Sequence, residues 1–100
     1  MQVVVQIPSS LRQFSDGRRQ VPIECAEPST VETVFEQLHT CHPGVVERVL
    51  DERGQVREHV NVFVDGQSVR AGLKLGLATP VNAGTEVWIL PSVSGGSGQA

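Results

Sequence analysis

One amphipathic helix limits the folds that this chain can adopt. Its apolar side chains follow the i, i+3, i+4, i+7 spacing that forms a single stripe, in Val31, Val34, Phe35 and Leu38. A helix of about 12 residues is marginal in isolation, because most helical stability in proteins comes from packing an apolar face. The other segments must therefore supply a surface that covers this stripe.

The helix has a start signal and a stop signal in the sequence. Ser29 is predicted to cap it, with Glu32 reaching back to the cap, so that the helix begins near Thr30. The His-Pro-Gly sequence at residues 42–44 ends it. Residues 45–50 are expected to form one or two further helical turns.

Residues 2–7 and 20–25 are predicted to be the first two strands. In each, apolar and polar residues alternate with a period of two, which places one apolar row on one sheet face. Asp16 and Gly17 tolerate positive φ and suit the tight connection between the strands. Pro22 has no backbone N–H, so the second strand is expected at a sheet edge.

Three later segments complete the expected sheet. Residues 59–64 are dense in β-branched side chains and should form a central strand, followed by a tight turn. Residues 67–70 are expected to pair back briefly. Residues 71–84 should be mostly loop, because glycine and proline interrupt them repeatedly, and residues 85–90 form the last strand.

This order of strands and helix predicts an α+β fold. With the first and last strands paired in parallel around the helix, the fold is the β-grasp (ubiquitin-like) arrangement, a four- to five-stranded mixed sheet with one main helix packed on one face. We expect residues 1–93 to form this domain and residues 94–100 to be a flexible C-terminal tail.

The second face of the sheet is expected to carry large apolar groups. If Val87 and Ile89 face the helix, Trp88 faces the other way, and an uncovered apolar face is typical of a partner surface. The alternative is that the loop at residues 71–84 folds over Trp88 and buries it. The candidate partner surface comprises Phe63, Trp88, Leu90 and Pro91.

Charge and hydropathy exclude several classes of partner. The net charge is -3 and there is no run of Lys and Arg, which argues against nucleic acid. Arg18 and Arg19, like Arg53 and Arg57, are interpreted as scattered surface charges that favour solubility. No segment is long and apolar enough to span a bilayer, so we expect a cytoplasmic protein without a membrane partner.

The sequence predicts no active site of its own. His39, Cys41 and His42 lie close together, but their spacing fits no structural zinc pattern and a fourth ligand is absent, so no metal is expected. Cys25 and Cys41 are expected to be reduced. The sequence contains no phosphate-binding loop, nucleophile elbow or Cys-x-x-Cys pair. Stand-alone catalysis is therefore not expected, and no catalytic residue is assigned.

The C-terminal stretch is the second feature that points to function. No side chain after Glu86 is charged, and Gly95 and Gly96 lack Cβ atoms. Such a backbone can form a thread narrow enough to enter another protein's active site. The alternative is a loose terminus without a function.

Three motifs carry a resemblance to a known family. They are Val-Asn-Val-Phe-Val-Asp-Gly at residues 60–66, Gly-Leu-Ala-Thr-Pro-Val at residues 76–81, and Val-Trp-Ile-Leu-Pro-Ser-Val-Ser-Gly-Gly at residues 87–96. The chain resembles the ubiquitin-like sulfur carriers of the ThiS/MoaD superfamily. Within that superfamily it is most similar to the carriers that deliver sulfur for cysteine biosynthesis in actinobacteria.

The resemblance implies a function for the tail. An E1-like partner enzyme would use ATP to adenylate the carboxylate of Gly96, and a sulfur nucleophile would displace AMP to leave a thiocarboxylate. Val93, Ser94 and Gly95 would thread through the partner's channel, and a sulfur-accepting biosynthetic enzyme would take the sulfur. The chain would bind no cofactor and would be a protein co-substrate, not an enzyme.

Four residues that follow Gly96 conflict with this chemistry. The Gly96 carbonyl is bonded to Ser97 as an amide and cannot be adenylated. We therefore expect a protease, of the zinc metalloprotease type associated with some of these carriers, to cut after Gly96 and remove residues 97–100. The alternative is that these four residues are not native to the protein.

Three other functions share parts of this pattern and stay open here. The small subunit of molybdopterin synthase would co-purify with a large catalytic partner. A ubiquitin-like modifier would be conjugated through Gly96 to lysines of its targets, and Lys74 is the only lysine of this chain. A plain interaction module would not need Gly96. The destination of the sulfur is equally open among cysteine, a sulfur-containing cofactor and a secondary metabolite.

Overall fold

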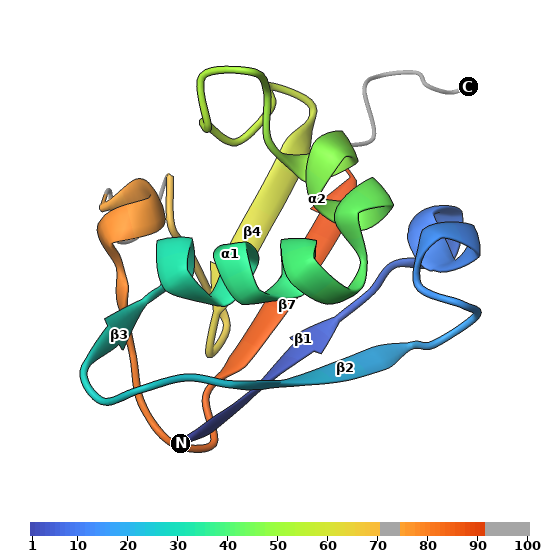
Figure 1. The fold of residues 1–100 in the computed structure, drawn as a ribbon. Helices are drawn as coiled ribbons and strands as arrows, with labels where there is room; N and C mark the ends of the chain where they lie inside the picture. Colours follow the sequence, from blue (N-terminus) through green and yellow to red (C-terminus); the bar gives the residue numbers. More distant parts are fainter. Residues whose placement is uncertain (71–74, 92–100) are drawn as a thin grey trace.

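The first and last strands of the chain pair in parallel inside a mixed sheet (Figure 1). The computed structural model describes residues 1–70 and 75–91. Its five-stranded sheet has the order β2-β1-β7-β4-β5. The strands are β1 (Gln2–Gln6), β2 (Gln20–Glu24), β4 (Val60–Val64), β5 (Gln67–Ser68) and β7 (Glu86–Pro91). All neighbours except β1 and β7 are antiparallel, which confirms the predicted β-grasp arrangement.

The strand positions follow from residue properties that the sequence shows. β2 lies at the sheet edge and pairs with β1 alone. Pro22 is tolerated there because an edge strand does not need a backbone N–H at every position for a second neighbour. β4 is internal, as predicted, but β7 holds the middle position. The turn after β4 uses Asp65 at φ 49° and Gly66 at φ 87°, the left-handed conformations that a tight hairpin requires.

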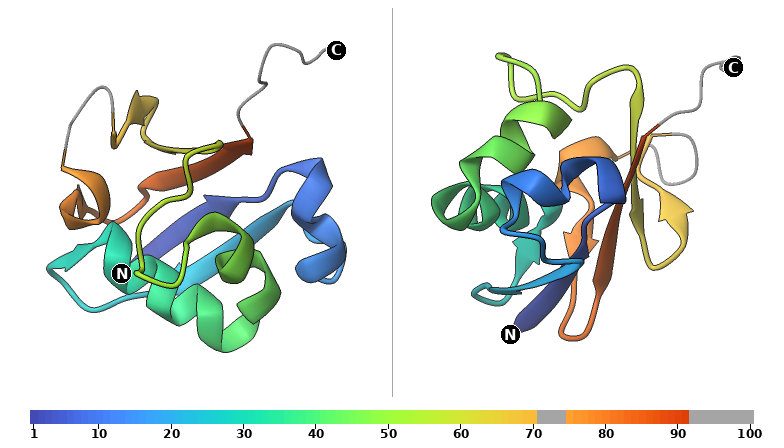
Figure 2. Two further views of the ribbon diagram at one scale, coloured as in Figure 1. Left: turned by 90° about the horizontal axis from the view of Figure 1, so that it is seen from above. Right: turned by 90° about the vertical axis from the view of Figure 1, so that its right-hand side faces the viewer.

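Two helices cover one face of the sheet (Figure 2). α1 (Val31–Cys41) buries all four side chains of the predicted apolar stripe, each with an exposed fraction of 1% or less. α2 (Pro43–Val49) follows at once, because Pro43 cannot continue α1 but is suited to a first helical turn. The buried apolar core lies between these helices and the inward rows of the strands. Its fully buried side chains include Val3, Val5, Val31, Val34, Phe35, Leu38, Val45, Val49, Val62, Val69, Val87 and Ile89.

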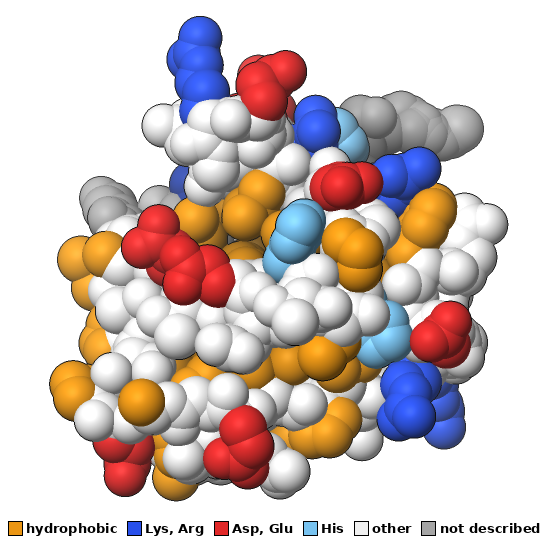
Figure 3. Space-filling view, in the orientation of Figure 1, with side chains coloured by type: hydrophobic (Ala, Val, Ile, Leu, Met, Phe, Trp, Pro, Cys, Tyr) orange, Lys and Arg blue, Asp and Glu red, His pale blue; other side chains and the backbone are white. Residues whose placement is uncertain are grey.

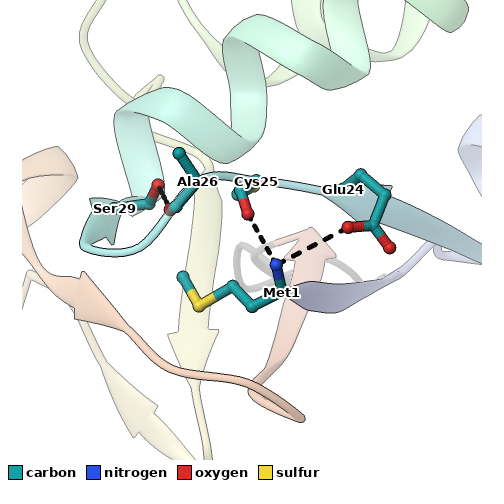
Figure 4. Close-up of polar contacts among 5 residues, drawn as sticks. All are labelled: Met1, Glu24, Cys25, Ala26 and Ser29. Atoms are coloured by element: carbon teal, nitrogen blue, oxygen red, sulfur yellow. Dashed lines mark hydrogen bonds and ion pairs between the residues drawn. The ribbon is translucent and has the colours of Figure 1, made fainter.

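The predicted cap of α1 is wrong. The N-cap residue is Thr30, and no side chain makes a capping hydrogen bond. The hydroxyl of Ser29 turns away and donates to the carbonyl of Ala26 (Figure 4). Ser29 and Thr30 form a short strand, β3 (Ser29–Thr30), and the first helical N–H, from Val31, donates to the Thr79 carbonyl at 2.9 Å. A backbone contact from another element thus satisfies the amide that a cap would otherwise satisfy.

The start of the chain is tied to the end of β2 (Figure 4). The Met1 amino group donates to the Cys25 carbonyl at 2.8 Å and lies 3.6 Å from the Glu24 carboxylate. Burial raises the pKa of the Cys25 thiol, although the nearby amino group acts in the opposite direction. Cys25 and Cys41 are both free thiols, the first buried and the second exposed.

The connecting segments contain more structure than the sequence predicts. A 3₁₀ helix, η1 (Ser9–Phe14), precedes the expected turn, in which Asp16 has φ 55° and Gly17 φ 78°. The loop expected at residues 71–84 contains η2 (Gly76–Ala78) and β6 (Pro80–Val81), and β6 pairs with β3. Within the described ranges, 1–70 and 75–91, no helix is long and apolar enough to cross a membrane.

The contact between Gly44 and Phe14 gives a first prediction. A Cβ at Gly44 would lie 2.9 Å from Phe14 Cδ1 and 3.2 Å from Phe14 Cβ. Gly44→Ala must therefore move the ring, whose centroid lies 3.9 Å from the Arg48 guanidinium carbon. We expect it to lower the free energy of unfolding by about 1 kcal/mol, because overpacking outweighs the gain in helix propensity.

The control for this prediction is the same substitution in a Phe14→Ala background. With the ring gone, only the propensity gain remains, so Gly44→Ala should there be neutral or stabilising. Chemical denaturation of the four proteins measures both effects. Equal losses in the two backgrounds would contradict the proposed contact.

Candidate functional site

The central strand β7 leads directly to the predicted carrier arm. Its last residue is Pro91, at the same end of the sheet as the end of β1. The arm residues of the prediction, Val93, Ser94, Gly95 and Gly96, lie outside the described residues. The described part of the candidate site is therefore the sheet surface beside the last residues of β7.

The side chains of β7 alternate between the core and the open face. Val87 and Ile89 are 0% and 1% exposed, whereas Trp88 and Leu90 are 38% and 39% exposed. This is one of the two arrangements that the sequence left open. The alternative, in which the preceding loop buries Trp88, is wrong, because more than a third of that side chain is exposed.

Phe63 and Trp88 lie opposite each other on the open face. They are partners in the β4–β7 register, and Phe63 is half-buried. The Trp88 indole N–H donates to Glu86 Oε1 at 3.2 Å, and the Glu86 N–H donates to Asp65 Oδ1 at 3.1 Å. Trp88 is thus held at one edge of its ring while its apolar surface stays accessible. We call Phe63, Trp88 and Leu90 the open-face patch. Pro91, the fourth residue of the predicted partner surface, is exposed but pairs with the buried Val60 and so follows the inward row at the end of the strand.

The opposite, helix-covered side carries the His and Cys side chains that the sequence analysis considered as metal ligands. There, charged side chains lie in small separate groups (Figure 3). His39 and Cys41 are exposed at the end of α1, and His42 caps it. Across residues 1–70 and 75–91, no group of three or more His, Cys, Asp or Glu is placed to hold a metal ion.

Asp51 is an acidic side chain in a loop, and its surroundings shift its pKa. The pKa of Asp51 is lowered chiefly by a hydrogen bond from the Gln55 N–H, and the Arg53 N–H donates to the same oxygen. Both contacts lie within one turn, at residues 51–55. The next three residues are held by the Arg70 side chain, which donates to the carbonyls of Val56, Arg57 and Glu58. The lowered pKa is a consequence of turn geometry and does not indicate an acid–base site.

Sequence reasoning missed two groups beside the open-face patch. Gln6 lies between Gln20 and Trp88 in the sheet register, and it is only 8% exposed. Arg12, Arg18 and Arg19 line a groove with Trp88. The sequence alone assigns no role to Arg12, and it indicates that the other two are scattered surface charges. The parallel register of β1 with β7 brings these groups together. Their proximity could have been predicted only from that register, which pairs Gln6 with Trp88.

Comparison with known proteins agrees with this geometry. The model of the ThiS family matches residues 5–96. The chain belongs to the ThiS family. The family match ends at Gly96, the residue at which the sequence predicted that the functional chain ends.

Three relatives show which proteins this ThiS-family protein is similar to. The Sulfur carrier protein CysO of Mycobacterium tuberculosis is 36% identical over 98 residues, covering 96% of this chain and 100% of that protein. A chain of the Amycolatopsis orientalis BexX/CysO complex is 31% identical, with a TM-score of 0.81 and coverage of 94% and 99%. Small archaeal modifier protein 1 of Haloferax volcanii is 34% identical over 80 residues, covering 80% and 85%. The chain is thus a ubiquitin-like protein similar to sulfur carriers.

The alternation along β7 gives a second prediction. Ile89→Ala should lower the free energy of unfolding by about 3 kcal/mol, because it leaves a cavity in the core. Leu90→Ala, one residue later on the open face, should lower it by less than about 1 kcal/mol. Urea denaturation of the two variants measures the difference, and equal losses would mean that the strand register is wrong.

Proposed function

We propose that this ThiS-family protein carries sulfur as a thiocarboxylate on Gly96. The observation that chiefly supports the proposal is the position of Gly96 relative to the sheet. The central strand β7 ends at Pro91, five positions before Gly96, and the family match ends at that glycine. A rigid strand followed by a short, uncharged arm suits delivery of a terminal group into another protein.

The proposed chemistry takes place on the carboxylate of Gly96. A carboxylate oxygen attacks the α-phosphorus of ATP in an E1-like partner, and pyrophosphate leaves. A sulfur nucleophile then attacks the acyl carbon of the adenylate, and AMP leaves with the bonding electron pair. With sulfide as the nucleophile, the thioacid that forms loses a proton and leaves a thiocarboxylate, which is a good nucleophile at neutral pH. ATP is thus used by the partner and is not a cofactor of this chain.

The open-face patch is proposed to dock the partner while the arm enters its active site. The exposed rings and side chains of Trp88 and Leu90 lie on the strand that continues into the arm, so binding there places the arm at the partner. Trp88 is of the residue class that most often dominates interface energetics. A solved complex among the relatives, that of BexX with CysO, supports a partner protein of this kind.

The destination proposed for the sulfur is a biosynthetic enzyme of cysteine, or of a sulfur-containing cofactor or secondary metabolite. Similarity to CysO proteins supports a sulfur-carrier role over that of a molybdopterin synthase subunit. Because residues 97–100 block Gly96, activation first requires hydrolysis of the bond between Gly96 and Ser97. A zinc metalloprotease is the proposed enzyme for that step.

A third prediction tests the carrier function by mass spectrometry. The chain ending at Gly96 is incubated with the E1-like enzyme of the source organism, ATP and sulfide. We expect one oxygen of the terminal carboxylate to be replaced by sulfur. The full 100-residue chain should not react, because its Gly96 carbonyl is an amide. Sulfur incorporation at Ala100 of the full chain, or none in the shortened chain, would contradict the proposal.

A fourth prediction tests the open-face patch. Trp88→Ala should raise the KM of the activating enzyme for the shortened chain about tenfold, with a smaller effect on kcat, because it removes docking contacts and not reacting groups. Leu75→Ala is the matched control, since Leu75 is also a large exposed apolar residue, at 53% exposure, outside the patch. Equal effects of the two substitutions would show that the patch does not dock the enzyme.

Similarity to a small archaeal modifier favours one second candidate function, conjugation to other proteins through Gly96. In that case the activated arm would form amide bonds with lysines of target proteins. Incubation of the shortened chain with cell extract, ATP and the activating enzyme distinguishes the two. Conjugates of higher mass support a modifier, whereas a thiocarboxylate consumed without conjugates supports a carrier.

A further inference from the structure

A groove of about 940 Å³ runs beside the second half of β7, next to the open-face patch. Its other walls are the segment after β1, with η1, and the turn that leads into β2. We call it the arginine groove and define it by Gln6, Arg12, Arg18, Arg19 and Trp88. Pro91, where the arm begins, lies at its rim.

The arginine groove is positively charged, although the chain as a whole is negatively charged. The chain has a net charge of -3 with eight Lys and Arg, and three of these eight, Arg12, Arg18 and Arg19, line this groove. No Asp or Glu is among its lining residues. The Arg18 and Arg19 side chains make no hydrogen bond or ion pair with any group in residues 1–70 and 75–91. Their charges are therefore available to an anionic ligand.

Gln6 adds a second, independent feature to the groove. It lies on the open face of β1 and is 8% exposed. Within the described ranges, its carboxamide has no hydrogen-bond partner. A buried amide without a partner is destabilising, because it loses its hydrogen bonds to water and gains none in return. Because a carboxamide both donates and accepts, the backbone of a peptide is a suitable ligand for it.

The backbone that carries the arginines is fixed in place. The buried Ser15 hydroxyl donates to the Arg18 carbonyl at 2.8 Å, and the Ile7 N–H donates to the Arg19 carbonyl at 2.8 Å. The Arg12 Nε donates to the Ile7 carbonyl at 3.2 Å. The groove wall is thus preorganised, and a ligand would order only the guanidinium ends.

We propose that the arginine groove binds an extended, acidic peptide segment of the protein that docks on the open-face patch. Its carboxylates pair with Arg18 and Arg19, its backbone bonds the Gln6 carboxamide, and its apolar side chains contact Trp88. The volume suits a peptide of several residues better than a single small anion, which would reach only one end of the groove. Only the identity of the partner as an activating or sulfur-accepting enzyme rests on the proposed function.

The fifth prediction is a titration followed by nuclear magnetic resonance. The ¹⁵N-labelled 100-residue chain is titrated with a capped synthetic peptide of alternating Glu and Val. We expect the Gln6 side-chain amide, the Trp88 indole N–H and the amides of residues 17–20 to shift together. Arg18→Gln with Arg19→Gln should weaken binding about fivefold, as expected for the loss of two exposed ion pairs.

Matched controls separate this site from general charge attraction. Arg18→Lys with Arg19→Lys keeps both charges and should retain most of the binding, and Arg53→Gln removes an exposed arginine outside the groove and should have no effect. A peptide with Gln in place of Glu should not bind. The proposal is wrong if the Gln peptide produces the same shifts, if Arg53→Gln weakens binding as much as Arg18→Gln with Arg19→Gln, or if no shifts occur at Gln6 and Trp88.

Inorganic phosphate serves as the last control. If phosphate produces the same shifts at the same concentration as the Glu peptide, the groove is a small-anion site and the proposal of a peptide segment is wrong. None of these titrations uses Gly96 chemistry. Failure here therefore leaves the thiocarboxylate test unaffected, and failure of that test leaves peptide binding standing.

Discussion

The parallel pairing of β1 with β7 is the contact on which the rest of the structure depends. It joins the two ends of the domain inside the sheet, with Val5 beside Val87. A connection between parallel strands cannot be a tight turn, and here the chain between them supplies both helices as well as β2, β4 and β5. α1 and α2 cover one face of the sheet, and the opposite face stays open. The same pairing aligns the ends of both strands, which brings Gln6 and η1 beside Trp88.

The two faces of β7 differ in burial, and the proposed function assigns recognition to the open one. The inward side chains of Val87 and Ile89 are completely buried and belong to the core, whereas the outward side chains of the strand remain accessible. In this proposal, residues one position apart in the sequence have different roles. The charge distribution adds a second level of selection, since arginines lie beside an apolar patch on a chain that is acidic as a whole.

Most of the fold could be predicted because it depends on patterns of period two and 3.6. The stripe of α1 and the apolar rows of β1 and β2 follow from such patterns, and the missing N–H of Pro22 predicts the edge position of β2. The exposure of Trp88 did not follow, because the sequence left the register of β7 open. The cap of α1 could not be predicted, because the Thr79 carbonyl, from a distant segment, meets the first helical N–H. β3 and β6 are too short to show a period, with two residues each. The arginine groove depends on register between strands, which single-sequence patterns do not encode.

The end of β7 at Pro91 also sets a length. Gly96 is five positions after Pro91, and an extended chain spans at most about 3.5 Å per residue, so the proposed Gly96 carboxylate can reach at most about 17 Å beyond the sheet. In the proposed carrier, the arm therefore limits how far the reacting carboxylate can lie from the docking surface. A partner that docks on the open face must hold its reacting atoms within that radius. Insertion of a single residue between β7 and the glycines would move the terminal group past them.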